Sequence, residues 1–438
     1  MKQPPKVRGL PLIGDSWSFI RDPIAYHDRT AQIYGPVFQS KVLGVSVYSL
    51  LGANCNRAVL QNSQDNFSCR EGYLPFLKQF GLSLLLMDGE QHRNHRSLIH
   101  QSFTRDALDK YLHEMNAGVD GALRSLRAGV SLKFHDFAKS VNLNIAVRLL
   151  TGVNLGTETE VAKMAFTDAI ESAGALIRIS LPGSAYRRGE KARLYLRGRL
   201  LHQMSADRNM SAAQDLLSRM LYGSRQSGTN MPEAAIVDHI NAILNGAHGT
   251  TSSVLSSLVY LLGANHEWQA RVRSEIKAYG DAYPGFKDIS SMVSLDAAYR
   301  EALRMYPPSI VILRKSKQAC AIEGFNIPGN SFICLAPRYT HFMSDFWEHP
   351  QDFSPDRFLP PRSEHKSHSH CWIPFGGGDH YCIGMHYAAL QTKVFIVHLL
   401  RRFTVGLLPN YRYRIKYAGV LAPADGLPIT LGEHRVQA

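Results

Sequence analysis

The sequence is poor in cysteine, tryptophan and acidic residues for its length. Its 438 residues include six cysteines and four tryptophans. The sequence has 36 Asp and Glu residues and 49 Lys and Arg residues. The cysteines, at positions 55, 69, 320, 334, 371 and 382, form no Cys-x-x-Cys pair and no Cys-x-x-Cys-His motif. This spacing argues against a disulfide framework, a zinc ribbon and a covalently attached haem.

The sequence also has no long hydrophobic run at its start. Met1 is followed by the segment KQPPK instead of the apolar stretch of a secretory signal or membrane anchor. We therefore predict a cytoplasmic protein without a membrane anchor. The net charge of +13 favours an acidic partner, but no module combining aromatic and basic residues is present, so we predict no nucleic-acid binding.

The composition and the order of the segments predict one domain over residues 1–438, mainly α-helical with a smaller β region (α+β). The chain is 45% hydrophobic and has no repeat or long linker, so it can bury one large core. Within this domain we expect a β-rich lead-in over 1–60, a helical part over 61–310 and a mixed part over 311–438.

Periodicity and turn signals predict the individual elements. Amphipathic stretches predict helices over 234–262 and 267–277, and β-branched residues predict a hairpin over 36–52. Strand-like segments return over 310–335, with a Pro-Gly turn at 328–329. The last forty residues predict another hairpin around an Asp-Gly turn at Asp425–Gly426.

One cysteine, Cys382, lies in a glycine-rich segment, FGGGDHYCIG, over residues 375–384. Glycines let a backbone approach a flat, bulky group and adopt positive φ angles. Backbone N–H groups of such a loop donate to a thiolate and tune it as a metal ligand, and a helix predicted over 388–400 adds a favourable dipole. For these residues alone, a glycine-rich loop with an incidental buried cysteine is the alternative interpretation.

The whole string Phe-x-x-Gly-x-His-x-Cys-x-Gly-x-x-x-Ala, over residues 375–388, resembles the haem-binding signature of the cytochrome P450 family, the haem-thiolate monooxygenases. The resemblance implies a non-covalent haem b whose iron takes the Cys382 thiolate as its axial ligand. His380 is a departure, because the family usually carries there an arginine that donates to a haem propionate. A histidine also donates one hydrogen bond, but its charge depends on a pKa of about 6.5. The other residues that this signature assigns to haem binding are Phe375, Gly376, Gly384 and Ala388.

Two upstream motifs of the same family concern the haem propionates and the N-terminal segments. His92 and Arg96, in DGEQHRNHR, share one helix face and resemble the pair that holds one propionate, and Arg314 is expected to reach the other. The resemblance covers roughly residues 8–432. Its first segments, GLPLIGD (9–15) and FIRDP (19–23), are similar to the branch of retinoic-acid hydroxylases and their cyanobacterial relatives.

A structural motif of the family follows the same order. Glu301 and Arg304 resemble its Glu-x-x-Arg pair, whose members share a helix face and can form an ion pair. The resemblance implies that Arg357, in PDRF (355–358), joins them. These three residues are expected to be structural and to take no part in the chemistry.

The segment GAHGTT, residues 246–251, resembles the oxygen-handling part of the family's long helix. The resemblance assigns the hydroxyl of Thr250, followed by Thr251, to proton delivery, whereas an i−4 back-bond is the ordinary interpretation of a helical threonine. The acidic residue that the family carries before this threonine is missing, and Gly249 occupies its position. A glycine inside a helix lowers the stability of the helix by about 1 kcal/mol relative to alanine. Either His248, water or the substrate completes the proton relay, or the enzyme performs different chemistry.

The resemblance implies a monooxygenase that inserts one oxygen atom from O2 into a C–H or C=C bond of a small lipophilic substrate. Electrons from NAD(P)H would arrive through a ferredoxin or flavodoxin, because the chain holds no flavin or iron–sulfur segment. An isomerase, dehydratase or peroxygenase without external electrons is the alternative, and a haem sensor or carrier is a third. The residues expected to line the substrate pocket are Phe76, Leu77, Ile243, Ala247, Ile310, Val311, Ile312 and Leu421.

Two further predictions concern the surface of a protein expected to be a monomer. Basic side chains are predicted to attract an acidic electron donor, with solvated helix faces as the alternative. The segment HKSHSHC, over 365–371, is interpreted as a solvated loop and not as a metal site, because its spacing is irregular. The basic residues are Arg93, Arg105, Lys110, Lys393, Arg401 and Arg402.

Overall fold

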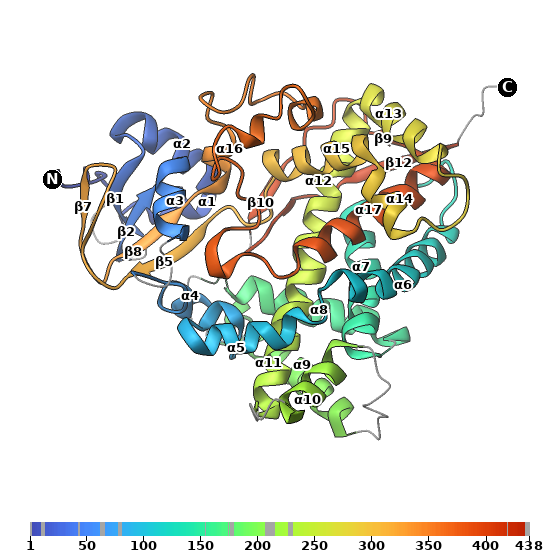
Figure 1. Ribbon diagram of the computed structural model, residues 1–438, viewed down its shortest axis with the longest axis horizontal. Coiled ribbons are helices and arrows are strands. Elements are labelled where there is room, and N and C mark those ends of the chain that lie inside the picture. Colours follow the sequence, from blue (N-terminus) through green and yellow to red (C-terminus); the bar gives the residue numbers. More distant parts are fainter. Residues whose placement is uncertain are drawn as a thin grey trace. The chain divides into compact units, whose positions relative to one another are not determined.

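The protein forms two compact units, each built from segments that lie far apart in the sequence (Figure 1). The first unit contains residues 1–78, 82–93 and 303–382, and the second contains 79–81, 94–302 and 383–438. The predicted division of a single domain at residues 60 and 310 stays a prediction. The computed structural model describes residues 2–9, 14–42, 44–61, 66–77, 81–153, 155–173, 175, 179–205, 215–226, 231–417 and 419–433.

The first unit is organised around a mixed sheet with the strand order β1-β2-β8-β5-β3 (Figure 1). β1 and β2 form the predicted antiparallel hairpin, and β8 pairs parallel to β2 and antiparallel to β5. Apolar side chains from all five strands are buried in one cluster that includes Val37, Leu50 and Ile333. The strands are β1 (Val37–Val42), β2 (Val45–Leu50), β3 (Phe67–Ser68), β5 (Ile312–Ser316) and β8 (Phe332–Leu335), and β6 (Cys320–Ile322) and β7 (Phe325–Ile327) form a separate hairpin.

Local signals explain where the helices of the first unit begin and how closely they pack. The Asp22 side chain accepts a hydrogen bond from the backbone N–H of Ala25, and Pro23 occupies the first position of the helix that follows. A Cβ atom at Gly72 would lie 2.7 Å from the Cα of Arg314, so only glycine permits this approach of helix to strand. The helices are α1 (Ser16–Arg21), α2 (Pro23–Tyr34), α3 (Ala53–Gln61), α4 (Cys69–Leu77) and α16 (Pro337–His341).

The second unit is mainly helical. The helix predicted over 234–262 is present as α11 and α12, separated by a five-residue π-helical segment, Gly246–Thr250. No helix in the described ranges is both long and apolar enough to cross a membrane. The helices are α6 (Arg105–Arg124), α7 (Phe134–Thr151), α8 (Thr159–Ala173), α9 (Ala185–Ser205), α10 (Leu216–Gln226), α11 (Glu233–Asn245), α12 (Thr251–Ala264), α13 (His266–Lys277), α14 (Phe286–Ser291) and α17 (Met385–Arg402), and α5 (Gly89–His100) and α15 (Val293–Met305) contribute residues to both units.

Buried hydrogen bonds join α12 to α7, and α7 to α17. Asn142 of α7 donates to the Ser252 hydroxyl at 3.0 Å, and Gln391 of α17 donates to the side-chain Oδ1 of Asn142 at 3.1 Å. His135 and the Ser256 hydroxyl are 2.9 Å apart. Paired polar groups in a buried interface specify one arrangement of the helices. These hydrogen bonds therefore fix the position of α12, and of the π-helical segment before it, relative to α7.

The predicted hairpin around Asp425–Gly426 is wrong. β11 (Leu421–Pro423) pairs with β10 (Ile415–Tyr417), whereas β12 (Pro428–Glu433) pairs with β9 (Phe403–Leu407) and β4 (Ser131–Lys133). Between β11 and β12, the Asp425 carboxylate accepts hydrogen bonds from the Tyr411 hydroxyl and the Leu427 amide. Leu427 has a positive φ of 56°, so the chain turns away into a different sheet.

Candidate functional site

Cys382 lies in an open, glycine-shaped loop of the first unit. Its backbone N–H donates to the carbonyl of Phe375 at 3.0 Å, and Gly376 and Gly378 adopt positive φ angles of 71° and 63°. Cys382 is exposed, whereas four of the other cysteines are buried and Cys320 is half-buried. Cysteine is among the residue types most often buried, so Cys382 is not an incidental core cysteine.

Two histidines and one carboxylate meet beside this loop. The ring of His92, at the start of α5, lies 4.0 Å from the ring of His380. The Nε2 of His380 is 3.4 Å from the Oδ1 of Asp88. Burial lowers the pKa of His380, although Asp88 opposes that shift. The sequence prediction included both histidines but missed Asp88.

Asp88 anchors this cluster to the rest of the first unit. Its carboxylate accepts hydrogen bonds from the Ser68 hydroxyl and from the backbone N–H of Cys69 at 3.0 Å. Burial raises the pKa of Asp88, but the hydrogen bonds from His380 and Ser68 outweigh burial and hold it below its usual value. The carboxylate therefore stays ionised and orients the imidazole of His380.

Arg314 supplies a buried cation in the same unit. The residue is 2% exposed, and its Nη1 donates to the Leu313 carbonyl at 2.8 Å. Its Nε atom is buried without a hydrogen-bond partner among the described residues. Arg314 lowers the pKa of His380, which places its charge close to that ring. A buried guanidinium of this kind needs an anion, so Arg314, His92 and His380 fit the carboxylate groups of a haem.

Of the four predicted propionate-binding residues, the structure brings together Arg314, His92 and His380. Arg96 follows His92 by one helical turn on α5, is half-buried, and belongs to the second unit. Its predicted role stays a prediction.

The oxygen-handling segment predicted over 246–251 covers the π-helical segment Gly246–Thr250 of the second unit and the first residue of α12, Thr251. The Thr250 hydroxyl donates to the Gly246 carbonyl at 2.6 Å, so the ordinary i−4 back-bond is present. His248 and Gly249 are buried, and burial lowers the pKa of His248 to about 3. His248 is therefore neutral near pH 7. π-Helical turns occur frequently at functional sites, which makes this segment a candidate for chemistry.

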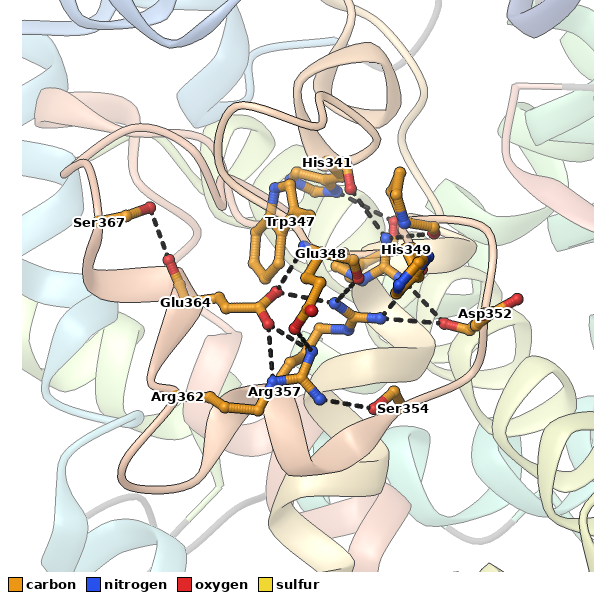
Figure 2. Close-up of polar contacts among 12 residues, drawn as sticks. His341, Trp347, Glu348, His349, Asp352, Ser354, Arg357, Arg362, Glu364 and Ser367 are labelled. Atoms are coloured by element: carbon orange, nitrogen blue, oxygen red, sulfur yellow. Dashed lines mark hydrogen bonds and ion pairs between the residues drawn. The ribbon is translucent and has the colours of Figure 1, made fainter.

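The two arginines assigned a structural role, Arg304 and Arg357, are buried and donate to main-chain carbonyls. Figure 2 shows Arg357 among its partners. Arg304 donates to the carbonyls of His341 and Pro350, at 2.9 and 2.8 Å. Both Arg304 and Arg357 donate to the carbonyl of Asp352, at 3.3 and 3.2 Å. Arg304 and Arg357 belong to the first unit, whereas Glu301, on α15, is buried in the second.

Glu364 is a member of this network that the sequence prediction missed. It accepts a hydrogen bond from Arg357 at 2.7 Å and also pairs with Arg362 (Figure 2). No short motif links position 364 to position 357, so only the folded loop shows the pair.

The predicted substrate-pocket residues divide between the units. Ile310 and Ile312 are buried in the first unit, where Ile312 belongs to the sheet core. Leu421 is buried in the second unit. Phe76, Leu77 and Val311 of the first unit and Ile243 and Ala247 of the second are half-buried, and a common pocket stays a prediction.

The segment over 365–371 is solvated only in part, because Lys366, Ser367 and Ser369 are exposed but its end is buried. His370 is 8% exposed and Cys371 is fully buried. The Cys371 Sγ lies 3.5 Å from the His365 carbonyl, so the segment folds onto itself. Among the residues that the structure describes, no group of His, Cys, Asp and Glu side chains is arranged to hold a metal ion.

Comparison with known proteins identifies the class. The family model described as Cytochrome P450 matches residues 4–427. Putative cytochrome P450 136 of Mycobacterium tuberculosis is 29% identical over 430 residues, covering 97% of this chain and 87% of the relative. Human cytochrome P450 26B1 is 26% identical over 439 residues, covering 96% and 85%. The solved structure described as retinoic acid bound cyanobacterial CYP120A1 shares 26% identity, covers 99% of both chains and has a TM-score of 0.91.

This chain therefore belongs to the cytochrome P450 family and is a cytochrome P450 monooxygenase. The predicted mainly helical α+β P450 fold is confirmed by the structural match. The predicted similarity to the retinoic-acid hydroxylase branch and its cyanobacterial relatives is confirmed as well. Family membership implies a haem cofactor.

Proposed function

We propose that this enzyme inserts one oxygen atom from O2 into a C–H or C=C bond of a small lipophilic molecule. The observation that carries the proposal is the exposed Cys382 in a glycine-shaped loop, in the same unit as the buried cation of Arg314. The thiolate of Cys382 would ligate the haem iron, and Arg314, His92 and His380 would bind the propionates. Bound haem supplies the oxygen-activating chemistry, and a thiolate ligand favours O–O cleavage.

The remaining predicted haem and oxygen contacts complete this proposal. Phe375, Gly376, Gly384 and Ala388 would shape the loop and the start of α17, and Arg96 would assist His92. The hydroxyl of Thr250 would hold and pass a proton at its Oγ atom, followed by Thr251. The protein's part is to bind the cofactor, exclude bulk water and time the arrival of protons.

An isoprenoid or fatty-acid-like substrate is the class that we propose. Its support is the apolar character of the predicted pocket residues, among them Ile243, Ile310 and Leu421, and the retinoic acid bound by the structurally similar CYP120A1. Pockets with apolar walls and few polar groups select ligands by shape and hydrophobic area.

A ferredoxin or flavodoxin is the proposed electron donor, and the protein is proposed to be a cytoplasmic monomer. The net charge of +13 supports an acidic donor. Lys393 is withdrawn from the predicted contact surface, because it is 8% exposed and its Nζ pairs with Asp296 at 2.6 Å. Arg402 pairs with Asp120 and is only partly available.

The test is product analysis of the purified holoprotein with retinoic acid, a diterpene and a long-chain fatty acid under ¹⁸O2. One set of reactions receives NADPH, ferredoxin and its reductase, and a second receives hydrogen peroxide alone. We expect a product that carries one ¹⁸O atom and forms only with the electron-transfer chain.

A control without substrate measures the background consumption of NADPH. A product that forms with peroxide alone, or a rearranged product without ¹⁸O, would contradict the proposal. Either result would favour the alternative of a haem-thiolate peroxygenase, isomerase or dehydratase.

A further inference from the structure

A cavity of about 300 Å³ in the second unit extends from exposed side chains to buried Gly249. Its walls come from β4 and α7, from α8, and from the segment around β10 and β11. Its exposed side includes Lys133, Asp136 and Lys416. The charged residues that line it are Lys133, Asp136, Lys139, Glu171, Lys416 and Asp425.

Gly249 lines the buried end of this cavity and adds no side chain to it. A Cβ atom at this position would meet only the Cδ1 of Ile170 within 4 Å, at 3.1 Å. A flexible isoleucine methyl group can move by a few tenths of an ångström, so a Cβ atom can be accommodated here after a small shift of Ile170. Glycine is the costliest ordinary residue inside a helix, apart from proline. The missing side chain therefore has a local cost and leaves a space at the position of the family's acid.

Polar groups beside this space can hold water. Lys139 donates from Nζ to the Thr167 hydroxyl at 2.8 Å, and that hydroxyl donates to the Lys163 carbonyl at 2.8 Å. Burial lowers the pKa of Lys139, while Asp136 and Glu171 oppose that shift. A cavity of this size with several polar partners holds ordered water, unlike an apolar cavity of the same volume.

His248 is a poor alternative source of protons. It is fully buried, it does not line the cavity, and its ring lies 5.7 Å from the ring of Phe166. Burial lowers the pKa of His248 to about 3, so its ring is neutral near pH 7 and has no imidazolium proton to donate.

We propose that this cavity admits the water that replaces the missing carboxylic acid, and that Lys139, Thr167 and Glu171 position that water next to Gly249. A water molecule in this space transfers a proton to the Oγ of Thr250, which passes its own proton onward. The resulting hydroxide is reprotonated through the cavity from bulk solvent, so no net charge accumulates. The inference rests on the proposed oxygenase function and identifies where its protons enter.

Thiol labelling of the holoprotein tests the water path without any turnover. Gly249→Cys is treated with iodoacetamide, and labelling of its peptide is followed by mass spectrometry so that native cysteines do not interfere. Ser253→Cys is the control, because Ser253 is fully buried on α12 and does not line the cavity. We expect labelling of Cys at 249 at least ten times faster than at 253. Adding Thr167→Met, which fills the cavity, should slow it at least fivefold.

A second measurement links the path to proton delivery. With the electron donor supplied, the share of electrons lost as hydrogen peroxide should rise severalfold in Thr167→Met and return toward the wild-type share when Gly249→Asp is added. Val161→Met is the matched control, since Val161 is exposed on the same helix and outside the cavity. The solvent deuterium isotope effect should increase in Thr167→Met alone.

Absence of labelling at position 249, or labelling that Thr167→Met does not slow, would overturn the proposal. An unchanged peroxide share in Thr167→Met would also overturn it. Failure of the wild type to bind haem or oxidise any substrate would instead contradict the proposed function, while the labelling result would still decide whether water reaches Gly249.

Discussion

At the scale of single residues, the buried arginines stabilise the loop that precedes the Cys382 segment. Arg357 is fully buried, and its guanidinium donates to Glu348, His349, Asp352 and Glu364. Three of these acceptors are main-chain carbonyls of one loop. A planar, permanently charged fork with five donors suits such a set, and lysine could not replace it.

Replacing Arg357 with Met should lower the free energy of unfolding by about 3 to 5 kcal/mol, because Glu364 and three carbonyls lose their donor. Arg362→Met is the matched control, since Arg362 pairs with the same Glu364 but its side chain is 32% exposed. Arg362→Met should lower the free energy of unfolding by less than about 1 kcal/mol. Urea unfolding measures both, and equal losses would contradict the assigned role of Arg357.

His341 should make the stability of the protein sensitive to acid. Its Nδ1–H donates to the Arg304 carbonyl, and its Nε2 accepts from the Ile373 amide at 2.9 Å. Burial lowers its pKa to about 3, and the nearby charges of Arg304 and Arg338 add to that shift. Since the pKa in the unfolded chain is near 6.5, the stability is fully present above about pH 6.5 and declines as the pH falls toward 3.

At pH 5 this single histidine should reduce the free energy of unfolding by about 2 kcal/mol relative to pH 7.5. The measurement is urea unfolding between pH 5 and 7.5 for the wild type and for His341→Asn, whose pH dependence should be shallower. His349→Asn is the control, because it removes an exposed histidine of the same unit instead of the buried one. A steep dependence retained in His341→Asn would contradict this assignment.

At the scale of elements, the approach of α4 to β5 determines where Arg314 lies. Gly72→Ala should destabilise the protein by about 2 kcal/mol, although alanine is the better helix former, because its Cβ would lie 2.7 Å from the Arg314 backbone. Displacement of Arg314 should also reduce the haem content of the purified protein. Gly198→Ala is the control, since Gly198 is an exposed position of α9 and no atom lies within 4 Å of a Cβ built there.

Gly198→Ala should leave the free energy of unfolding unchanged or raise it by up to about 1 kcal/mol. Thermal unfolding and the ratio of haem to protein absorbance measure both variants. A Gly72→Ala protein as stable and as rich in haem as Gly198→Ala would show that the close approach has no role.

Helices and local hairpins could be predicted from the sequence because their signals are local. The hairpin of β1 and β2 and the long helix over 234–262 follow from spacing and turn residues. The partner of β12 could not be predicted, since β9 and β11 offer similar short strands and only the fold selects β9. The π-helical turn was also missed, because no propensity distinguishes it from the helix around it.

Among site residues, those within a motif could be predicted, and those joined only by folding could not. Cys382, His380 and Arg314 belong to motifs with fixed spacing. Asp88 and Glu364 contact residues far away in the sequence or outside any motif. Lys393 was assigned to the surface, yet its position in α17 is buried against Asp296.

At the scale of the whole molecule, the charge of +13 should govern encounter with an acidic electron donor. Reduction by ferredoxin should slow about tenfold between 0.05 and 0.5 M salt, because screening shortens the reach of the electrostatic attraction. Stopped-flow spectroscopy measures the rate. Photoreduction by an uncharged deazaflavin is the control, and an equal salt dependence of both reactions would contradict electrostatic steering.

The central claim is that this P450 binds haem through the thiolate of Cys382. The most direct measurement is the absorbance spectrum of the reduced protein with carbon monoxide, for the wild type, Cys382→Ala and the control Cys320→Ala. The account predicts a strongly red-shifted Soret band in the wild type and in Cys320→Ala, and its loss in Cys382→Ala. A Soret band at the shorter wavelength of nitrogen- or thiol-ligated haem in the wild type, or a red-shifted band that persists in Cys382→Ala, would contradict it.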